Sequence, residues 1–138
     1  MRKTRQVVVG LGLLSIDQMT KYGAGYFGSV RLNAGVSLSF LETVPPFLLS
    51  MGSAFLLGIL VYTWYTAKNR TLSWGLVALI AGGSANLVDR VWFGAVRDWL
   101  PMPLLGGKNN IADWILSIGV FGIIVALLRM QESSIKVE

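Results

Sequence analysis

The sequence contains no cysteine and no histidine among its 138 residues. The lack of cysteine excludes disulfides and thiol nucleophiles, and the lack of histidine excludes an imidazole base. The usual zinc sites, which are built largely from these two residue types, are excluded as well. We therefore expect neither a metal ion nor an organic cofactor. Any catalysis must use carboxylates, lysine or hydroxyl groups.

Charged residues are also scarce, because they make up only 14% of the chain, against about 25% of a typical soluble domain. Hydrophobic residues account for 54%, and the mean hydropathy is +0.61. The formal net charge of +5 comes from basic residues spread over the segment ends, whereas a nucleic-acid site needs a clustered patch. Nucleic-acid binding is therefore not expected, and the composition predicts a small polytopic membrane protein.

Four apolar segments are long enough to cross a bilayer, which takes about 20 mainly apolar residues in a helix. They run over residues 6–27, 46–67, 72–93 and 111–130. We predict an all-α membrane protein in which residues 1–138 form a single domain of four transmembrane helices. The link Val30–Leu41 has partly alternating polarity, which is compatible with short strands. The link Gly94–Asn110 contains prolines and glycines, so it should be irregular. Together these links would form a small extracytoplasmic region of β-like or irregular structure.

The distribution of lysine and arginine near the segment ends predicts the orientation of the chain. One side would carry seven basic residues: Arg2, Lys3, Arg5, Lys68, Arg70, Arg129 and Lys136. The other would carry five: Lys21, Arg31, Arg90, Arg97 and Lys108. We therefore place both termini in the cytoplasm and the two longer loops outside. The basic start followed by Val7–Ile16 also resembles a signal peptide, but Asp17 and Lys21 follow at once, so we expect a retained helix.

All four aspartates of the chain, Asp17, Asp89, Asp98 and Asp113, lie inside or at the edge of apolar segments. A charged side chain at the centre of a membrane helix costs about 2.5–3.5 kcal/mol on insertion scales, so scattered aspartates are not expected without a function. In the predicted orientation all four reach the same depth, near the outer leaflet. This shared depth predicts one buried polar site.

The spacing of polar residues within the predicted helices supports such a site. Asn86 and Arg90 are four residues apart, and Asn110 and Asp113 are three apart, so each pair lies on one helix face. The small residues over 81–85 would let another helix or a substrate approach the third helix closely, although plain helix packing is their commoner role.

Each aspartate also has a purely structural explanation. Asp17 and Lys21 can form an ion pair that neutralises itself, and Asp89 could be an interfacial anchor or a member of another such pair. Asp98 could be a solvated loop residue, and Asp113 could cap the last helix. Taken singly, none of the four identifies a site, whereas their common depth favours a joint one.

Five short motifs occur in order along the chain. They are Asp17-Gln18-Met19-Thr20-Lys21, then Asn33-Ala34-Gly35 with Ser39-Phe40-Leu41, then GGSANLVDR over Gly82–Arg90, then Val96-Arg97-Asp98-Trp99, and finally Asn110-Ile111-Ala112-Asp113. In residues, order, spacing and four-span layout the chain resembles the lipoprotein signal peptidases (signal peptidase II), the aspartyl proteases of the bacterial inner membrane. The resemblance extends from Asp17 to the start of the fourth predicted helix.

The resemblance implies a catalytic dyad of Asp98 and Asp113. The substrate would be a prolipoprotein, cut just before its diacylglyceryl-modified cysteine near the outer leaflet of the bacterial cytoplasmic (inner) membrane. The positions that match residues supporting the dyad or the substrate in the family are Asp17, Lys21, Asn33, Gly35, Gly82, Asn86, Arg90 and Asn110. No cofactor is implied, and we expect a monomer in contact with membrane lipids.

The chain departs from the family pattern at several positions. Val36, Leu38, Ala85, Asn109 and Trp114 replace residues of a different size or type, and Arg97 replaces an apolar residue just before the first dyad aspartate. The first outer loop is also short. These departures leave the chemistry intact and concern substrate choice, so the alternative function is that of a divergent paralogue with another membrane peptide as substrate.

Two carboxyl groups in one site cannot both ionise cheaply, so the pair would hold a single proton. The ionised member can activate water, and the protonated member can assist the carbonyl and the leaving group. A small proton-coupled membrane carrier and a non-catalytic scaffold are two other classes that could carry such residues. A carrier usually places its charges near the membrane midplane, whereas these residues cluster at one interface, so we favour a protease.

Overall fold

The structure of the protein is a computed structural model that describes residues 2–35, 44–102 and 107–135. Within these ranges the chain forms four long helices, α1 (Arg2–Tyr26), α2 (Pro46–Thr66), α3 (Arg70–Phe93) and α4 (Ile111–Ile135). Four short strands lie in the links: β1 (Arg31–Asn33), β2 (Val96–Asp98), β3 (Leu100–Pro101) and β4 (Lys108–Asn109). The predicted, mostly helical fold is therefore confirmed, and each predicted span falls on one helix.

Local sequence signals explain where the central helices begin and end. Pro46 lies in the first turn of α2, where a missing N–H costs no hydrogen bond. Asn69 caps α3, because its side-chain oxygen accepts a hydrogen bond from the Leu72 N–H at 2.9 Å. Gly94 ends α3 in the left-handed conformation (φ 70°), and its N–H donates to the Arg90 carbonyl. The tight turn before Asn69 makes α2 and α3 antiparallel neighbours.

Helix α3 is the centre of the bundle and packs most closely against α4. Glycines allow this contact: a Cβ at Gly82 would lie 2.7 Å from the carbonyl oxygen of Ala112, and one at Gly75 would lie 3.0 Å from that of Gly119. These distances are shorter than van der Waals contact, so the two backbones can approach only where side chains are missing. The contact at Gly82 brings the start of α4 against the C-terminal half of α3.

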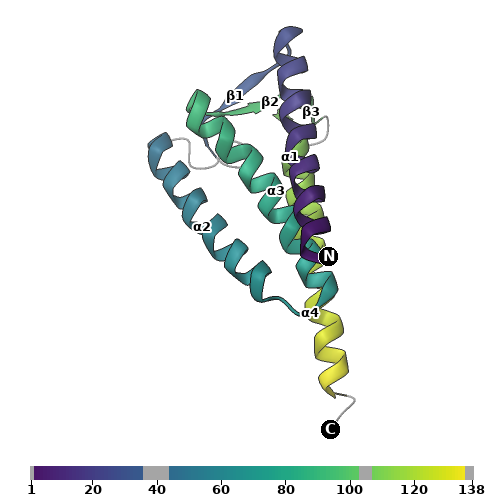
Figure 1. Ribbon diagram of the computed structural model, residues 1–138. Coiled ribbons are helices and arrows are strands. Elements are labelled where there is room, and N and C mark those ends of the chain that lie inside the picture. The colour runs from purple at the N-terminus through teal and green to yellow at the C-terminus, as the bar shows by residue number, and fades with distance from the viewer. Residues whose placement is uncertain (1, 36–43, 103–106, 136–138) are drawn as a thin grey trace.

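Helix α2 lies at the edge of the molecule and leans away from the other three helices (Figure 1). None of its residues is buried, and large apolar side chains such as Phe47, Phe55 and Tyr62 are exposed. Among the described residues, α2, Arg70–Phe93 and Ile111–Ser133 are the three helices long and apolar enough to cross a membrane. The fourth predicted span, which corresponds to α1, stays a prediction.

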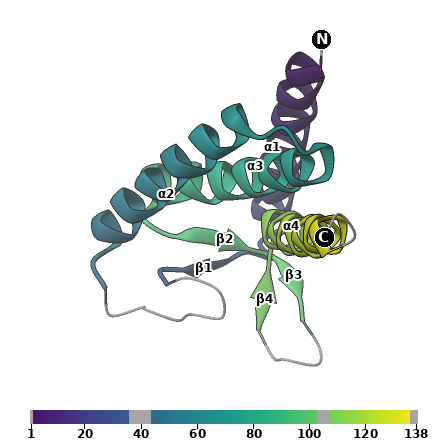
Figure 2. The same cartoon turned by 90° about the horizontal axis from the view of Figure 1, so that it is seen from below.

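The strands form two small antiparallel pairs at the end of the bundle where α1 ends (Figures 1 and 2). β1 pairs with β2 so that Arg31 lies opposite Asp98, and β3 pairs with β4. The small β-like region is therefore present. The link over 94–110, which was expected to be irregular, contains three of the strands, and Pro101 is tolerated because it ends an edge strand. Residues 36–41 of the other predicted strand region lie outside the described residues.

A separate polar cluster joins α1, α2 and α3 at the opposite end of the bundle. Gln6 is fully buried, and its Oε1 accepts hydrogen bonds from Trp64 Nε1 at 3.1 Å and from Ser73 Oγ at 3.0 Å. The ammonium group of Lys3 lies 4.4 Å from the centre of the Trp64 ring. The helices therefore cannot separate at this end without exposing buried hydrogen-bonded groups to hydrocarbon.

Candidate active site

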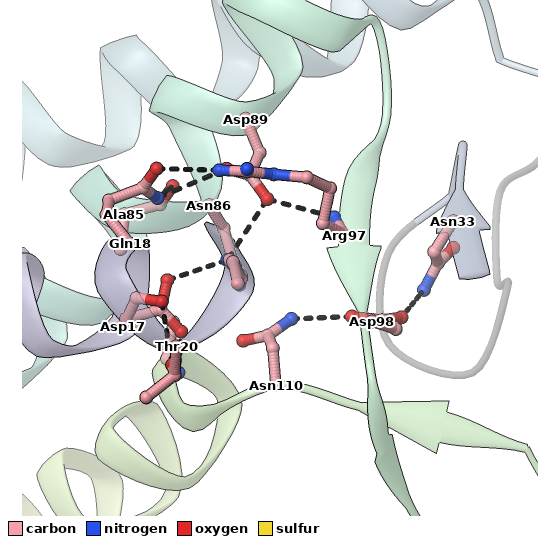
Figure 3. Close-up of polar contacts among 12 residues, drawn as sticks. Asp17, Gln18, Thr20, Asn33, Ala85, Asn86, Asp89, Arg97, Asp98 and Asn110 are labelled. Atoms are coloured by element: carbon pink, nitrogen blue, oxygen red, sulfur yellow. Dashed lines mark hydrogen bonds and ion pairs between the residues drawn. The ribbon is translucent and has the colours of Figure 1, made fainter. Parts of the chain in front are cut away.

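Asp98, the last residue of β2, is held by two side-chain amides. The residue is 2% exposed. Asn33 Nδ2 donates a hydrogen bond to its Oδ2 at 2.9 Å, and Asn110 Nδ2 donates to its Oδ1 at 2.6 Å. Figure 3 shows the two amides on opposite sides of the carboxyl group. Asp98 is thus fixed by β1 on one side and by the start of α4 on the other.

Asn110 links the two predicted dyad residues. While its Nδ2 holds Asp98, its Oδ1 accepts a hydrogen bond from the backbone N–H of Asp113 at 3.0 Å. A spacing of three residues is that of a helix N-cap, so Asn110, and not Asp113, caps α4. The amide of Asn33 is oriented in a similar way, because its Oδ1 accepts from the Gly35 N–H at 3.1 Å. Both amides are therefore forced to present their NH₂ groups to Asp98.

Asp113 lies in the first turn of α4 and is partly buried. Its Oδ1 accepts a hydrogen bond from Asn86 Nδ2 at 3.0 Å, and Asn86 Oδ1 accepts in turn from Lys21 Nζ at 2.9 Å. Because a lysine ammonium group can only donate, Lys21 decides which end of the Asn86 amide faces Asp113. The neutral side chain of Asn86 therefore bridges the ammonium group of Lys21 and the carboxyl group of Asp113.

Lys21 and Asp17 are fully buried on α1 and form an ion pair of 2.7 Å. Lys21 Nζ also lies 3.2 Å from Asp89 Oδ2, so its ammonium group contacts Asp17, Asp89 and Asn86. The second oxygen of Asp17 accepts a hydrogen bond from the Ala112 N–H at 2.8 Å. The ion pair considered from the sequence is present, and it also anchors the start of α4.

Asp89, which is fully buried on α3, is held by Arg97 and Gln18 (Figure 3), and it also forms an ion pair with Lys21. Arg97 donates to it from its backbone N–H at 2.9 Å and from Nη2 at 2.8 Å, and Gln18 Nε2 donates at 3.1 Å. Sequence reasoning treated Arg97 as a departure and gave Gln18 no role. The one signal for Gln18 is its place in the first motif, directly after Asp17.

Arg90 is buried on α3 and is a third cation of the site. Its Nη2 donates to the carbonyl of Gly35 at 2.9 Å, and its charge acts on the carboxyl groups of Asp89, Asp98 and Asp113. Asn86 and Arg90 were predicted to share a helix face, and they serve two parts of the same site. Asn86 holds Asp113, whereas Arg90 ties α3 to the segment after β1.

The charges of the site almost cancel. Four aspartates meet three cations, Lys21, Arg90 and Arg97, so one proton on the carboxyl groups makes the site neutral. Burial raises the pKa of Asp98 above its ordinary value of 3.8, although the hydrogen bonds from its two amide partners oppose the shift. A carboxyl group that can hold a proton is therefore part of the site.

Nearly all of the residues predicted for the site belong to this one network. It contains Asp17, Lys21, Asn33, Gly35, Asn86, Arg90, Asp98, Asn110 and Asp113. Gly82 does not contact it and instead lies at the contact of α3 with Ala112, which is the packing role considered for the small residues. It affects the site only through the position of α4.

Two of the departures from the family pattern contact each other. With the amide of Asn109 turned so that its oxygen faces Trp114, this oxygen accepts a hydrogen bond from Trp114 Nε1 at 3.0 Å. The residue before a helix cap and the fourth helical residue are often in contact, usually through apolar side chains. A third departure, Ala85, accepts a hydrogen bond from Gln18 Nε2 at its carbonyl at 3.0 Å. Val36 and Leu38 lie outside the described residues.

The arrangement is suited to acid–base chemistry. Asn110 joins the carboxyl group of Asp98 to the backbone N–H of Asp113. Amide side chains fix the orientation of both carboxyl groups. In the described part of the chain no group of three or more histidine, cysteine, aspartate or glutamate side chains could hold a metal ion. The site can bind a proton and pass it between water and a bound carbonyl compound.

Comparison with known proteins identifies relatives over most of the chain. The profile of a family described as "Signal peptidase (SPase) II" matches residues 9–129. The lipoprotein signal peptidase of Gloeothece citriformis (strain PCC 7424) is 30% identical, with 94% of this chain and 90% of the relative covered. That of Syntrophus aciditrophicus (strain SB) is 31% identical, with 91% and 92% covered.

Solved structures have the same fold. One, described as "Bacterial membrane enzyme structure by the in meso method at 2.3 A resolution", gives a TM-score of 0.85 at 25% identity, with 94% of this chain and 91% of that chain covered. Another, with the same description at 1.9 Å, gives a TM-score of 0.79 at 26% identity, with 91% and 93% covered. From the family profile, the relatives and the fold together, the chain belongs to the signal peptidase II family of membrane proteases.

Proposed function

We propose that this signal peptidase II uses Asp98 and Asp113 as the catalytic pair that cleaves signal peptides from prolipoproteins. One observation carries the assignment. Among the residues that the structure describes, Asp17 and Asp89 form ion pairs with buried cations, whereas the side-chain partners of Asp98 and Asp113 are neutral amides. An ion pair holds a carboxylate in its charged form, whereas a buried carboxyl group among neutral partners can gain and lose a proton.

The pair holds one proton between its two carboxyl groups. The ionised group accepts a proton from water while that water attacks the scissile carbonyl carbon. The protonated group donates a hydrogen bond to the carbonyl oxygen and stabilises the negative charge that develops there. A proton then passes to the leaving nitrogen as the C–N bond breaks, and the pair returns to its singly protonated form. The proton belongs to the pair and not to one aspartate, because coupled groups titrate together.

The substrate follows from the family and from the place of the site. The compared relatives are lipoprotein signal peptidases, and the proposed cleavage is at the bond before a diacylglyceryl-modified cysteine. The two acyl chains would stay in the hydrocarbon, beside apolar side chains that the helices expose. The bilayer would then hold the peptide bond at the level of the strands, which lowers the entropy that the enzyme must supply to orient it.

The protein lies in the bacterial inner membrane, and the proposed reaction requires a particular orientation there. α1 would be the fourth span, both termini would face the cytoplasm, and the catalytic pair would lie near the outer leaflet. In support, α1 begins and α4 ends away from the strands (Figure 1), and the basic residues Arg2, Arg5, Lys68 and Arg70 lie at or beside the helix ends that would face the cytoplasm. All side chains of the site come from one chain, so we infer an active monomer.

The test is cleavage of a diacylglyceryl-modified prolipoprotein by the purified protein in detergent, followed by the shift of its band on a gel. Asp98→Asn and Asp113→Asn should each lower the rate about 100-fold or more, because an amide cannot take a proton from water. The same peptide without the lipid should stay uncut. Glu132→Gln, at an exposed position near the other end of α4, is the matched control and should cut normally.

Circular dichroism and thermal unfolding show whether each variant is folded. They therefore separate loss of activity caused by the missing carboxyl group from loss of activity caused by unfolding. Full activity in a folded Asp98→Asn or Asp113→Asn protein would contradict the catalytic pair. Absence of cleavage by the folded wild-type protein would instead contradict the substrate and point to a different membrane peptide.

A further inference from the structure

Arg97 binds one buried carboxylate with both its backbone and its side chain. Its N–H donates to Asp89 Oδ2 at 2.9 Å, and its Nη2 donates to Asp89 Oδ1 at 2.8 Å. The guanidinium group also lies 4.3 Å from the centre of the Phe93 ring, and its Nη2 donates to Gln18 Oε1 at 2.8 Å. The side chain is only 13% exposed. Its charge therefore acts in surroundings where solvent screens it weakly.

The double attachment lies one residue before Asp98. Both oxygens of Asp89 are used: Arg97 and Gln18 meet Oδ1, while the Arg97 N–H and Lys21 meet Oδ2. Strand β2 is thereby fixed to α3 at the position that precedes the candidate catalytic residue. A substitution of Arg97 would therefore affect the catalytic pair in two ways, by loosening the attachment of β2 to α3 and by removing a positive charge.

The charge of Arg97 completes a balanced group of four. Asp17 and Asp89 carry two negative charges, and Lys21 and Arg97 carry two positive ones. Without Arg97, Lys21 would be the one cation of this group in contact with both carboxylates, and the remaining three residues would carry a net negative charge. This charge would lie close to the pair, since Lys21 holds the Asn86 amide that holds Asp113.

The other elements around the pair do not replace this charge. Within the described ranges, the charged groups that face the pair or Asp89 are Asp17 and Lys21 from α1, Asp89 and Arg90 from α3, Arg97 from β2, and Asp98 and Asp113 themselves. Arg31 of β1 is exposed, and Lys108 of β4 donates to the Ser29 carbonyl. Helix α2 contributes no charged residue.

We propose that Arg97 is a positioning residue that balances the charge of Asp89 and thereby sets the pH range in which the Asp98–Asp113 pair is active. The inference rests on the proposed function of that pair. A cation near the pair favours its ionised form, and an additional negative charge favours its protonated form. Loss of the Arg97 charge therefore moves the activity to higher pH, and loss of the Asp89 charge moves it to lower pH.

The experiment compares the pH dependence of kcat/KM for Arg97→Gln and Arg97→Lys with that of the wild-type protein, on a diacylglyceryl-modified peptide in detergent. Glutamine keeps a donor for Asp89 without the charge, and lysine keeps the charge without the planar guanidinium. The acid limb of Arg97→Gln should move up by about half a pH unit or more. That of Arg97→Lys should stay at the wild-type position, even where the rate itself falls.

A charge-reversed comparison separates this role from a purely structural one. Asp89→Asn should move the acid limb down, and Asp89→Asn combined with Arg97→Gln should bring it back towards the wild-type position, because the remaining group is again neutral. Loss of packing alone would lower rates without this ordered set of shifts. If Arg97→Gln does not fold, the Asp89→Asn variant tests the inference alone: an acid limb that moves to lower pH supports it, and one that stays or moves to higher pH contradicts it.

An unshifted profile in folded Arg97→Gln, or a shift in the same direction for Asp89→Asn, would overturn the inference. With Asp98→Asn inactive in the same assay, that result would leave the catalytic pair in place and remove only the role of Arg97. Activity in Asp98→Asn would instead remove the pair itself.

Discussion

Lys21 explains how two aspartates can be buried as carboxylates. Its ammonium group forms ion pairs with Asp17 at 2.7 Å and Asp89 at 3.2 Å, and it donates a hydrogen bond to Asn86 at 2.9 Å. Removing one partner of a buried ion pair typically costs about 3–5 kcal/mol, because the other charge is left uncompensated. Asp98 has no such cation among its direct partners in the described residues, where two amides hold it, and the charge of Lys21 acts on it only from a distance. The neighbours, and not the residue type, decide which aspartates can hold a proton.

The raised pKa of Asp98 predicts a pH-dependent contribution to stability. A carboxyl group whose pKa is higher in the folded protein than in the unfolded chain binds protons more strongly when folded, so its contribution is greatest at low pH. The contribution should be lost as the pH rises from the ordinary pKa of 3.8 through the raised value. In detergent, the melting temperature of the wild-type protein minus that of Asp98→Asn should therefore fall over this range. A difference that stays constant with pH would contradict the raised pKa.

The start of α4 is fixed by three residues that lie outside this helix. Asn110 caps it from the strand side, Asp17 of α1 accepts the Ala112 N–H at 2.8 Å, and Asn109 holds Trp114. The N-terminus of a helix carries partial positive charge on its free N–H groups, so the carboxylate of Asp17 is favourable there. The position of Asp113 is thus set by contacts outside its own helix.

The close packing of α3 on α4 predicts that Gly82→Ala will be harmful. The added Cβ would lie 2.7 Å from the Ala112 carbonyl oxygen, and overpacking of this kind costs about 1–3 kcal/mol. Moving Ala112 also moves Asp113, so the cleavage rate should fall about 10-fold or more. The matched control is Gly58→Ala in α2, where an added Cβ meets nothing within 4 Å. Equal melting temperatures and rates for the two variants would show that α4 can move without affecting the site.

The sequence predicted the positions of the helices better than the long-range contacts that build the site. The apolar runs and the spacing of Asp17 and Lys21 are local signals, and the corresponding helices and ion pair are present. Contacts such as Asn33 with Asp98 join residues 65 positions apart, so they depend on the register of two strands too short to show a pattern. The roles of Gln18 and Arg97 were missed for the same reason. A polar residue near a membrane segment shows no preference for a partner until the packing of α1 against α3 is known.

The bilayer acts as the solvent for most of the molecule. α2 packs against α3 along one face but has no buried residue, so its remaining, largely apolar surface would lie in lipid. α1 is less apolar in composition, but its two central charged residues, Asp17 and Lys21, are fully buried and paired. The side chains that α1 exposes include Val8, Leu11 and Met19. Hydropathy summed along the sequence therefore underestimates how apolar the outer face of α1 is.

Labelling at the two ends of α1 can test its predicted passage through the membrane. The chain has no cysteine, so each single cysteine is the only thiol present. Arg5, Arg31 and Lys68 are exposed and each loses one positive charge when replaced, which makes Arg5→Cys, Arg31→Cys and Lys68→Cys a matched set. In bacteria with a permeable outer envelope, a membrane-impermeant maleimide should label Arg31→Cys at once. It should label Arg5→Cys and Lys68→Cys only after the inner membrane is opened.

If positions 5 and 31 react alike, α1 does not span the membrane. If the pattern is reversed, the catalytic pair faces the cytoplasm, where a lipid-anchored segment outside the cell could not reach it.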